Sequence, residues 1–447
     1  MEVVLFLALS VLGAARARPE TRVPAAGHET RALVPQPQFL FAPPGGQGMG
    51  TACACTAPTS TKGSVLSVTR ASVGYCNKRG FATTGIQNGD LVRCDTNKPR
   101  IQPGVLNGPL GLLVERDSTN TLWPSESLST NWVLTNSGCS AATKSDNAAA
   151  APDGTVTAEQ LNLQACSAGT SSYVYNSAAF CPQDVSTTFS FYAKAAGVGD
   201  EGTLYYAVYN GSAWSCNSCV ISSSSWSRCS KTLDTSATAT AYVAIGNYHH
   251  CSGSAFPAKS VYVWGHQCEV GAYATSYIQT TTGADSRAGE GDKFDDSKTT
   301  IGSAPGSMGV TVVPMYTGTG PAAGGYTYFM DMRSSSWTNG IMAYNNAGTS
   351  VCSNYNGPNP VTAEASYSFS ASAPTRVWCA SDFGASTQIY GRMGGTNLPL
   401  VDNVGGAAFS TSGPIVVGAG GGGATAHGKT DAVLYNVCVD PNKSRCQ

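Results

Sequence analysis

Apolar and polar residues alternate along most of the chain in short runs that are typical of β-strands. In the stretch 261–264, Val261 and Val263 alternate with Tyr262 and Trp264. Similar runs recur at intervals of about ten residues, separated by Gly, Asn and Ser turns, whereas helical periodicity is almost absent. The sequence therefore predicts an all-β protein with two antiparallel β-sandwiches.

The distribution of these runs predicts two main domains. We expect the first sandwich at 122–283, a linker at 284–300 and the second sandwich at 301–447. Short strand-like runs at 63–121 precede or complete a sandwich, and they echo the strip 285–302. Because they are too short to bury a core alone, we expect them to add strands to the C-terminal sandwich, with the first sandwich as an insertion.

The N-terminal segment has the pattern of a secretory signal. An apolar run, too short to span a bilayer, is followed by a small-x-small cleavage site at Ala15-Arg16-Ala17, which predicts a signal peptide at 1–17. Glu2 stands where a positive residue is usual, so the start of an intracellular protein is the alternative. Residues 18–62 are predicted to form a Pro/Gly/Ala-rich linker or arm.

The cysteines favour a disulfide-stapled, exported protein, secreted or at the cell surface. The 16 cysteines fall into three groups, each with an even number of members, so we expect pairing within each group. The groups are Cys53, Cys55, Cys76 and Cys94; Cys139, Cys166, Cys181, Cys216, Cys219, Cys229, Cys251 and Cys268; and Cys352, Cys379, Cys438 and Cys446. A zinc site around Cys216 and Cys219, with Cys229, Cys251, His249 and His250 nearby, is the alternative, but no second matching pair is present.

Charge and composition exclude several functions. Only 12% of the residues are charged, the net charge is −1 and no basic stripe is present, which argues against nucleic-acid binding. No further segment predicts a membrane span, and the 51 glycines suit a chain of short strands and turns.

An ordered series of motifs resembles a known group of proteins. The series comprises "LGLLVERDSTNTL", "NW", "APDGT", "FSFYAKA", the "W" and "R" of "SSSWSRCSKTL", and "VYVWGHQCEVGAYATSYIQTTTGADSRA". It is similar to a module of phage tail and tail-fibre proteins and related secreted bacterial proteins, over roughly residues 64–440. The chain departs from that pattern by its apparent signal peptide, its many cysteines and Cys268 at a usually aliphatic position.

This resemblance implies a carbohydrate-binding-like jelly roll at 122–283, followed by a laminin-G- or concanavalin-like sandwich. The implied function is a secreted or surface protein that binds a polysaccharide or cell-surface glycan. A phage tail component for host recognition, located in the virion, is one alternative. In the jelly roll, Val261–Glu269 is expected to form the last strand, followed by a Thr-rich connector whose hydroxyls satisfy exposed backbone groups.

We assign no catalytic residues. The chain has no nucleophile elbow, zinc-protease motif or P-loop, and "VVGAGGGGATAHG" lacks the helix that a dinucleotide site needs. Asp331, Glu364, Asp382 and Asp431 are scattered acids that do not alternate along one strand. A polysaccharide-degrading sandwich enzyme is therefore only the second alternative.

No cofactor is predicted, and a structural Ca²⁺ is the one metal that the sequence suggests. Asp292, Asp295 and Asp296 offer oxygen ligands, although a solvated linker also explains them. His249 and His250 lack acidic partners nearby in the sequence, so we expect a surface loop there.

Ligand contacts are expected at exposed aromatic residues on loops. Trp132, Trp226, Trp264 and Trp378 fall within strand patterns and are predicted to lie in cores. By contrast, Trp337 falls in a Ser/Asn/Gly turn between two strands. The candidate ligand-binding residues are Trp337, Asn339, Tyr344 and Asn345, and, on the first sandwich, Trp214.

Overall fold

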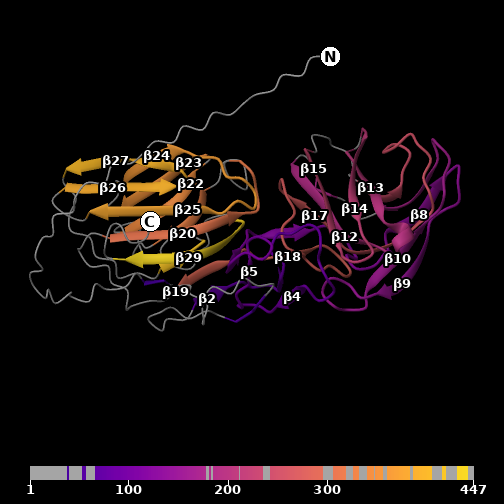
Figure 1. The fold of residues 1–447 in the computed structure, drawn as a ribbon, viewed down its shortest axis with the longest axis horizontal. Helices are drawn as coiled ribbons and strands as arrows, with labels where there is room; N and C mark the ends of the chain where they lie inside the picture. The colour runs from indigo at the N-terminus through magenta and orange to yellow at the C-terminus, as the bar shows by residue number, and fades with distance from the viewer. Residues whose placement is uncertain are drawn as a thin grey trace, which may run out of the picture. The chain divides into compact units, whose positions relative to one another are not determined.

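The alternating runs form strands in a computed structural model of the protein (Figure 1). The structure describes residues 38–39, 53–56, 66–177, 181–182, 185–210, 212–234, 242–294, 306–318, 326–331, 340–346, 348–355, 360–382, 386–404, 415–418 and 430–440. Within these ranges the chain is all-β, and its one helical element is the 3-10 turn η1 (Val198–Asp200). The all-β prediction is confirmed. None of the described segments forms a helix with the length and hydropathy needed to cross a membrane.

The first sandwich consists of two five-stranded antiparallel sheets. One has the order β15-β12-β17-β10-β9, with β9 (Thr143–Ala149), β10 (Ala158–Leu163), β12 (Ser186–Ala195), β15 (Ser227–Asp234) and β17 (Lys259–Val270). The other has the order β14-β13-β16-β11-β8, with β8 (Trp132–Ser137), β11 (Ser171–Asn176), β13 (Gly202–Tyr209), β14 (Trp214–Ile221) and β16 (Tyr242–Asn247).

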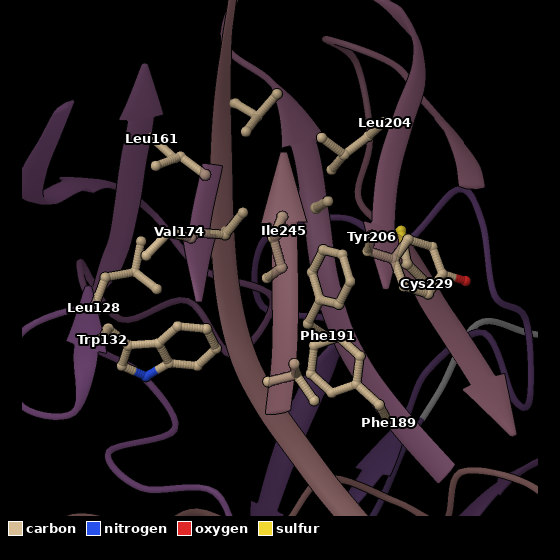
Figure 2. Packing of buried hydrophobic residues seen from close by; sticks show 14 of the residues in the cluster. Leu128, Trp132, Leu161, Val174, Phe189, Phe191, Leu204, Tyr206, Cys229 and Ile245 are labelled. Carbon is tan, nitrogen blue, oxygen red and sulfur yellow. The ribbon is translucent and has the colours of Figure 1, made fainter. Parts of the chain in front are cut away.

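The core of this sandwich lies between the two sheets (Figure 2). Phe189 and Phe191 from β12 stack at 5.3 Å between ring centroids, and Phe191 meets the ring of Tyr206 edge-on at 5.2 Å. Trp132 and Ile245 come from the opposite sheet and are 5% and 0% exposed. Phe189 and Phe191 thus fill the inner face of their sheet, and the core prediction for Trp132 is confirmed.

Strand β17 changes faces at a β-bulge. Val261 and Val263 point into the core and Trp264 points to the outer face, as regular alternation requires. At Gly265, which has φ +66°, the pairing with β12 shifts, so that His266 and Cys268 lie on the core side. Trp264 is nevertheless fully buried, because it packs in a cluster with Tyr75, Ile86 and Tyr277. The core assignment of Trp264 is confirmed, as it is for Trp226 (0% exposed) and Trp378 (5% exposed).

The second sandwich pairs an eight-stranded with a seven-stranded sheet. The first has the order β27-β26-β25-β20-β29-β6-β5 with β1 added on β29, from β1 (Gln38–Phe39), β5 (Ile101–Pro103), β6 (Leu110–Val114), β20 (Gly306–Pro314), β25 (Thr375–Asp382), β26 (Ser386–Met393), β27 (Thr396–Val404) and β29 (Ala432–Asp440). The second has the order β2-β19-β28-β21-β22-β23-β24, from β2 (Leu66–Thr69), β19 (Gly291–Phe294), β21 (Tyr326–Asp331), β22 (Gly340–Asn346), β23 (Thr349–Tyr355), β24 (Pro360–Ser366) and β28 (Ile415–Val417).

Strands from before the first sandwich thus complete the second one. Strand β2 pairs with β19, and β6 pairs with β29, each antiparallel. Two small sheets lie in the same region: β3 (Gly74–Asn77) with β4 (Leu91–Cys94), and β7 (Ser118–Asn120) with β18 (Asp285–Arg287). The chain leaves for the first sandwich after β7 and returns in β18, so the first sandwich is inserted between paired strands.

A buried ion-pair network joins these distant segments. Glu290 lies 2.9 Å from the Nη1 of Arg70 and 2.5 Å from the Nη2 of Arg100, and Arg100 also pairs with Glu115 at 2.5 Å. These side chains are at most 1% exposed. Burial alone would raise the pKa of Glu115, but Arg287 and Arg100 outweigh burial and lower that pKa to about 2. The network is therefore charged at neutral pH. It holds the segment before the first sandwich against the segment that follows it.

The connector after β17 contributes to the same junction. The hydroxyl of Thr275 donates to Glu269 at 2.6 Å, and that of Ser276 donates to Glu115 at 2.6 Å. Thr275 is fully buried. The expectation that the hydroxyls satisfy exposed backbone groups is therefore wrong for these two, which bind buried carboxylates. The motif "VYVWGHQCEVGAYATSYIQTTTGADSRA" therefore has a structural role, because its side chains bind carboxylates at the junction of the two sandwiches.

The described cysteines form disulfides within their sequence groups. The pairs are Cys53–Cys76, Cys55–Cys94, Cys139–Cys166, Cys181–Cys268, Cys216–Cys251, Cys219–Cys229 and Cys352–Cys379. Cys438 is also disulfide-bonded, while Cys446 lies outside the described residues. The prediction of pairing within groups is confirmed for these seven pairs.

His266 is expected to make the first sandwich sensitive to acid. It is 1% exposed, with its ring 4.6 Å from that of Trp132, and burial lowers its pKa to about 4 from the usual 6.5. The unfolded chain binds a proton at His266 more readily than the folded chain does. The contribution of the neutral, buried His266 to the free energy of unfolding is therefore complete above pH 6.5 and is lost as the pH falls towards 4. The lost free energy of unfolding is about 3 kcal/mol.

Urea unfolding of wild type and His266→Gln between pH 7 and 4 measures this effect. The variant is expected to lose less stability over that range than the wild type. His250→Gln, at an exposed histidine, is the control and should change the wild-type slope less than His266→Gln does. Equal slopes for wild type and His266→Gln would contradict the assignment.

Candidate functional site

Strand alternation directs aromatic side chains to the outer face of the sheet β14-β13-β16-β11-β8. On β13, Leu204, Tyr206 and Val208 point into the core, so Tyr205 and Tyr209 lie on the other side. Of the run "YYAVY", Tyr206 and Val208 therefore fill the inner face, whereas Tyr205 and Tyr209 do not. The same alternation places further aromatic residues outside: Tyr173 and Tyr175 on β11, Tyr242 on β16 and Trp214 on β14.

Six rings on this side form a closed circuit, which we call the aromatic face. Neighbouring ring centroids around the circuit lie between 4.6 and 6.4 Å apart, the range of interacting aromatic pairs. Five of the rings are partly exposed, and the sixth, Tyr248, is 4% exposed. In order around the circuit the residues are Tyr173, Tyr175, Tyr242, Tyr209, Trp214 and Tyr248.

Small residues form the floor of the aromatic face. Ala207 and Ala244 pair across β13 and β16 and are 0% and 1% exposed. Tyr248 contacts Tyr173 at 4.6 Å and Trp214 at 4.9 Å, on opposite sides of this row. The short alanine side chains leave room for the Tyr248 ring to lie between its neighbours.

Covalent and hydrogen bonds fix the turn that carries Tyr248. The disulfide Cys216–Cys251 ties the turn after β16 to the edge strand β14. The amide of Cys251 donates to the carbonyl of Tyr248 at 2.8 Å, and the amide of His249 donates to the hydroxyl of Ser171 at 2.8 Å. The rings are therefore held on a rigid scaffold, which reduces the entropy that a ligand must overcome.

The aromatic face is uncharged near neutral pH. Burial raises the pKa of Tyr173 and of Tyr248, so both phenols stay protonated. Burial and the neighbouring His249 lower the pKa of His250, which keeps that imidazole neutral. Binding at this face would therefore depend on ring contacts and neutral hydrogen bonds, with little dependence on salt.

The structure places the predicted ligand-binding residues differently. Trp214 belongs to the aromatic face, whereas Trp337 and Asn339 lie outside the described residues. Tyr344 and Asn345 lie within β22 and are 8% and 0% exposed, so they do not form an exposed surface beside a turn. Asn345 instead accepts a hydrogen bond from the amide of Gly348 at 3.0 Å and holds the turn between β22 and β23.

The predicted metal ligands are only partly described. Asp292 lies within β19, where it pairs with Val68 and Val417, and Asp295 and Asp296 lie outside the described residues. The calcium site thus stays a prediction. The cysteines of the alternative zinc site are bound in the disulfides Cys216–Cys251 and Cys219–Cys229, which leaves those four without a thiolate for a metal.

Sequence reasoning missed five of the six rings. The run "SSYVYN" carries a signal, because Tyr173 and Tyr175 alternate with the core residue Val174. Alternation shows that two faces exist, but an aromatic side chain suits either face, and only the fold decides which one is covered.

Comparisons with known proteins add distant likenesses. No protein-family model and no curated protein match the chain. Mouse laminin alpha1 chain domains LG4-5 are 11% identical, with 62% of this chain and 87% of that chain covered and a TM-score of 0.21. The CBM22-1-CBM22-2 tandem domain from Paenibacillus barcinonensis Xyn10C is 8% identical, with 73% and 97% covered and a TM-score of 0.25.

A crystal structure of HCR/D-Sa-GBL1/C also matches, at 9% identity and a TM-score of 0.25. The match covers 35% of this chain and 38% of that chain, so this chain spans less than half of its length. Likenesses at these TM-scores support no functional argument. The functional assignment has to rest on the aromatic face.

Proposed function

We propose that the protein binds a polysaccharide or cell-surface glycan, and that the aromatic face stacks against the apolar faces of its sugar rings. The observation that carries this proposal is the closed circuit of six rings on the outer face of a sheet. Contiguous exposed apolar surface on a soluble protein marks an interaction site. Tyrosine hydroxyls and the Trp214 indole add hydrogen-bonding groups beside the rings.

The dimensions of the aromatic face favour a chain of sugars over a single ring. The circuit spans β11, β16, β13 and β14, four neighbouring strands. Strands lie about 4.8 Å apart, so the face extends for about 14 Å across the sheet. Several consecutive sugar rings would contact it at once.

We also propose that the protein works outside the cell. Seven disulfides among the described residues support an oxidising compartment, and they weigh against assembly as a phage tail part in a reducing cytoplasm. The signal peptide at 1–17 lies outside the described residues. N-terminal sequencing of the exported chain should find Arg18 first, and an uncleaved chain in the cytoplasm would oppose this proposal.

We further propose that the protein holds its glycan without cleaving it. Of the acids considered, Asp431 is buried and paired with Arg116 at 3.2 Å, and Glu364 is exposed on the edge strand β24. Asp331 lies on β21 and is 1% exposed. Incubation with a polysaccharide panel should release no reducing ends, and their release would favour the enzyme alternative.

Replacing Trp214 by alanine is expected to weaken glycan binding at least tenfold, a loss of about 1.4 kcal/mol. The side chain is partly exposed, so the melting temperature should shift by less than about 4 °C. Calorimetric titration with the strongest binder from a glycan array measures the affinity. Val220→Ala, on the same strand and 70% exposed, is the control and should bind as wild type. Unchanged binding together with a large loss of stability would make Trp214 purely structural.

A further inference from the structure

A cavity lies beside the sheet β15-β12-β17-β10-β9, on the side of the first sandwich opposite to the aromatic face. It has a volume of about 230 Å³ and is lined by the outer side of β12 and β15, the segment 75–83, the connector 273–277 and residues of the second sandwich, among them Met315 and Ser372. Tyr192 and Arg228 line it from the sheet, and Tyr75 and Tyr277 line it from the covering segments. No residue of the aromatic face lines this cavity.

Arg228 is a cation without a counterion among the described residues. Its Nη2 donates to the hydroxyl of Ser190 at 3.1 Å, and its guanidinium carbon lies 5.3 Å from the centre of the Tyr192 ring. The Nε is buried and has no hydrogen-bond partner in the described part of the chain. A partly buried charge with an unused donor costs free energy, which an anion in the cavity would offset.

The walls of the cavity suit a small ring with hydroxyl groups. The rings of Tyr75 and Tyr277 lie 5.1 Å apart, and burial raises the pKa of both phenols, so they remain neutral. Asn77, Gln102 and Ser230 add amide and hydroxyl groups to the lining. Drug-sized ligands occupy clefts of about 300–1,000 Å³, so a smaller cavity admits one ring.

We propose that this cavity binds a carboxylated monosaccharide of the hexuronic acid class. The carboxylate would accept a hydrogen bond from the guanidinium group of Arg228, and the sugar ring would lie against the tyrosines. Charge-assisted hydrogen bonds between arginine and carboxylate are strong and directional, which gives selectivity for the acid over the neutral sugar. The site does not depend on glycan binding at the aromatic face.

Calorimetric titration with D-glucuronate and with D-glucose at equal ionic strength tests the proposal. Wild type should bind glucuronate at least tenfold more tightly than glucose. Arg228→Met, which removes the charge and keeps an apolar stem over Tyr192, should weaken glucuronate binding at least tenfold. Lys98→Met, which removes an exposed cation, is the matched control and should bind as wild type. A disaccharide with a terminal glucuronate, used as a further probe, distinguishes a free sugar acid from a glycan end.

A second variant keeps the test decisive if Arg228→Met fails to fold. Ala82 lines the cavity, so Ala82→Trp should fill it and abolish glucuronate binding with Arg228 in place. Equal binding of glucuronate and glucose, no binding of glucuronate, or wild-type binding by a folded Arg228→Met would overturn the proposal. Glycan binding by the aromatic face is measured separately with Trp214→Ala, so either proposal can fail alone.

Discussion

Replacing Glu290 by glutamine is expected to lower the free energy of unfolding by about 3–5 kcal/mol. The carboxylate of Glu290 neutralises Arg70 and Arg100, whose side chains are fully buried. Glutamine has nearly the same shape but no charge, so two buried guanidinium groups would lose their shared counterion. Urea unfolding at pH 7 measures the change.

The control for this experiment is an ion pair at the surface. Arg93 and Asp95 lie 3.4 Å apart with side chains 56% and 74% exposed, so Asp95→Asn should change stability by less than about 1 kcal/mol. If Glu290→Gln cost no more than this control, the buried network would not hold the junction together.

The C-terminal fragment 290–447 is expected not to fold when it is expressed alone. It lacks β2 and β6, which pair with β19 and β29 of the second sandwich, and β5, which pairs with β6. It also lacks Arg70, Arg100 and Glu115, so Glu290 would have no partner. Two-dimensional NMR should show poor dispersion for the fragment and good dispersion for the chain 18–447. A stable, well-dispersed fragment would contradict the interleaved architecture.

Much of the fold could be predicted from local patterns. The alternation around Val261 and Val263 identified a strand, and the large side chains of Trp132 and Trp226 identified core positions. These predictions succeed because period-2 alternation and the burial of bulky apolar groups are local consequences of strand geometry.

Other features depend on contacts between distant segments. Glycine can mark a bulge, but the face change at Gly265 follows from the pairing of β17 with β12. The arginines of the junction meet Glu290 only after the first sandwich has been inserted, since Arg100 and Glu290 are 190 residues apart in sequence. Disulfide partners likewise follow from the fold and not from cysteine spacing.

The candidate site was predictable only in part. Trp214 was identified from its place near a turn, but its ring partners come from four other places in the sequence: Tyr173 and Tyr175, Tyr209, Tyr242, and Tyr248. Sequence periodicity does not show which side of a sheet is covered by a second sheet. A tyrosine on the covered side lies in the core, whereas one on the other side can bind a ligand.

Hydroxyl-radical footprinting with mass spectrometry tests whether the aromatic face is the glycan-binding site. The protein is oxidised with and without a saturating amount of the strongest glycan from the array. We expect oxidation of Trp214, Tyr209 and Tyr242 to fall several-fold on binding, while oxidation of the exposed Val220, on the same strand as Trp214, does not change. Unchanged oxidation of these three rings, with protection elsewhere in the chain, would show that the aromatic face is not the glycan-binding site.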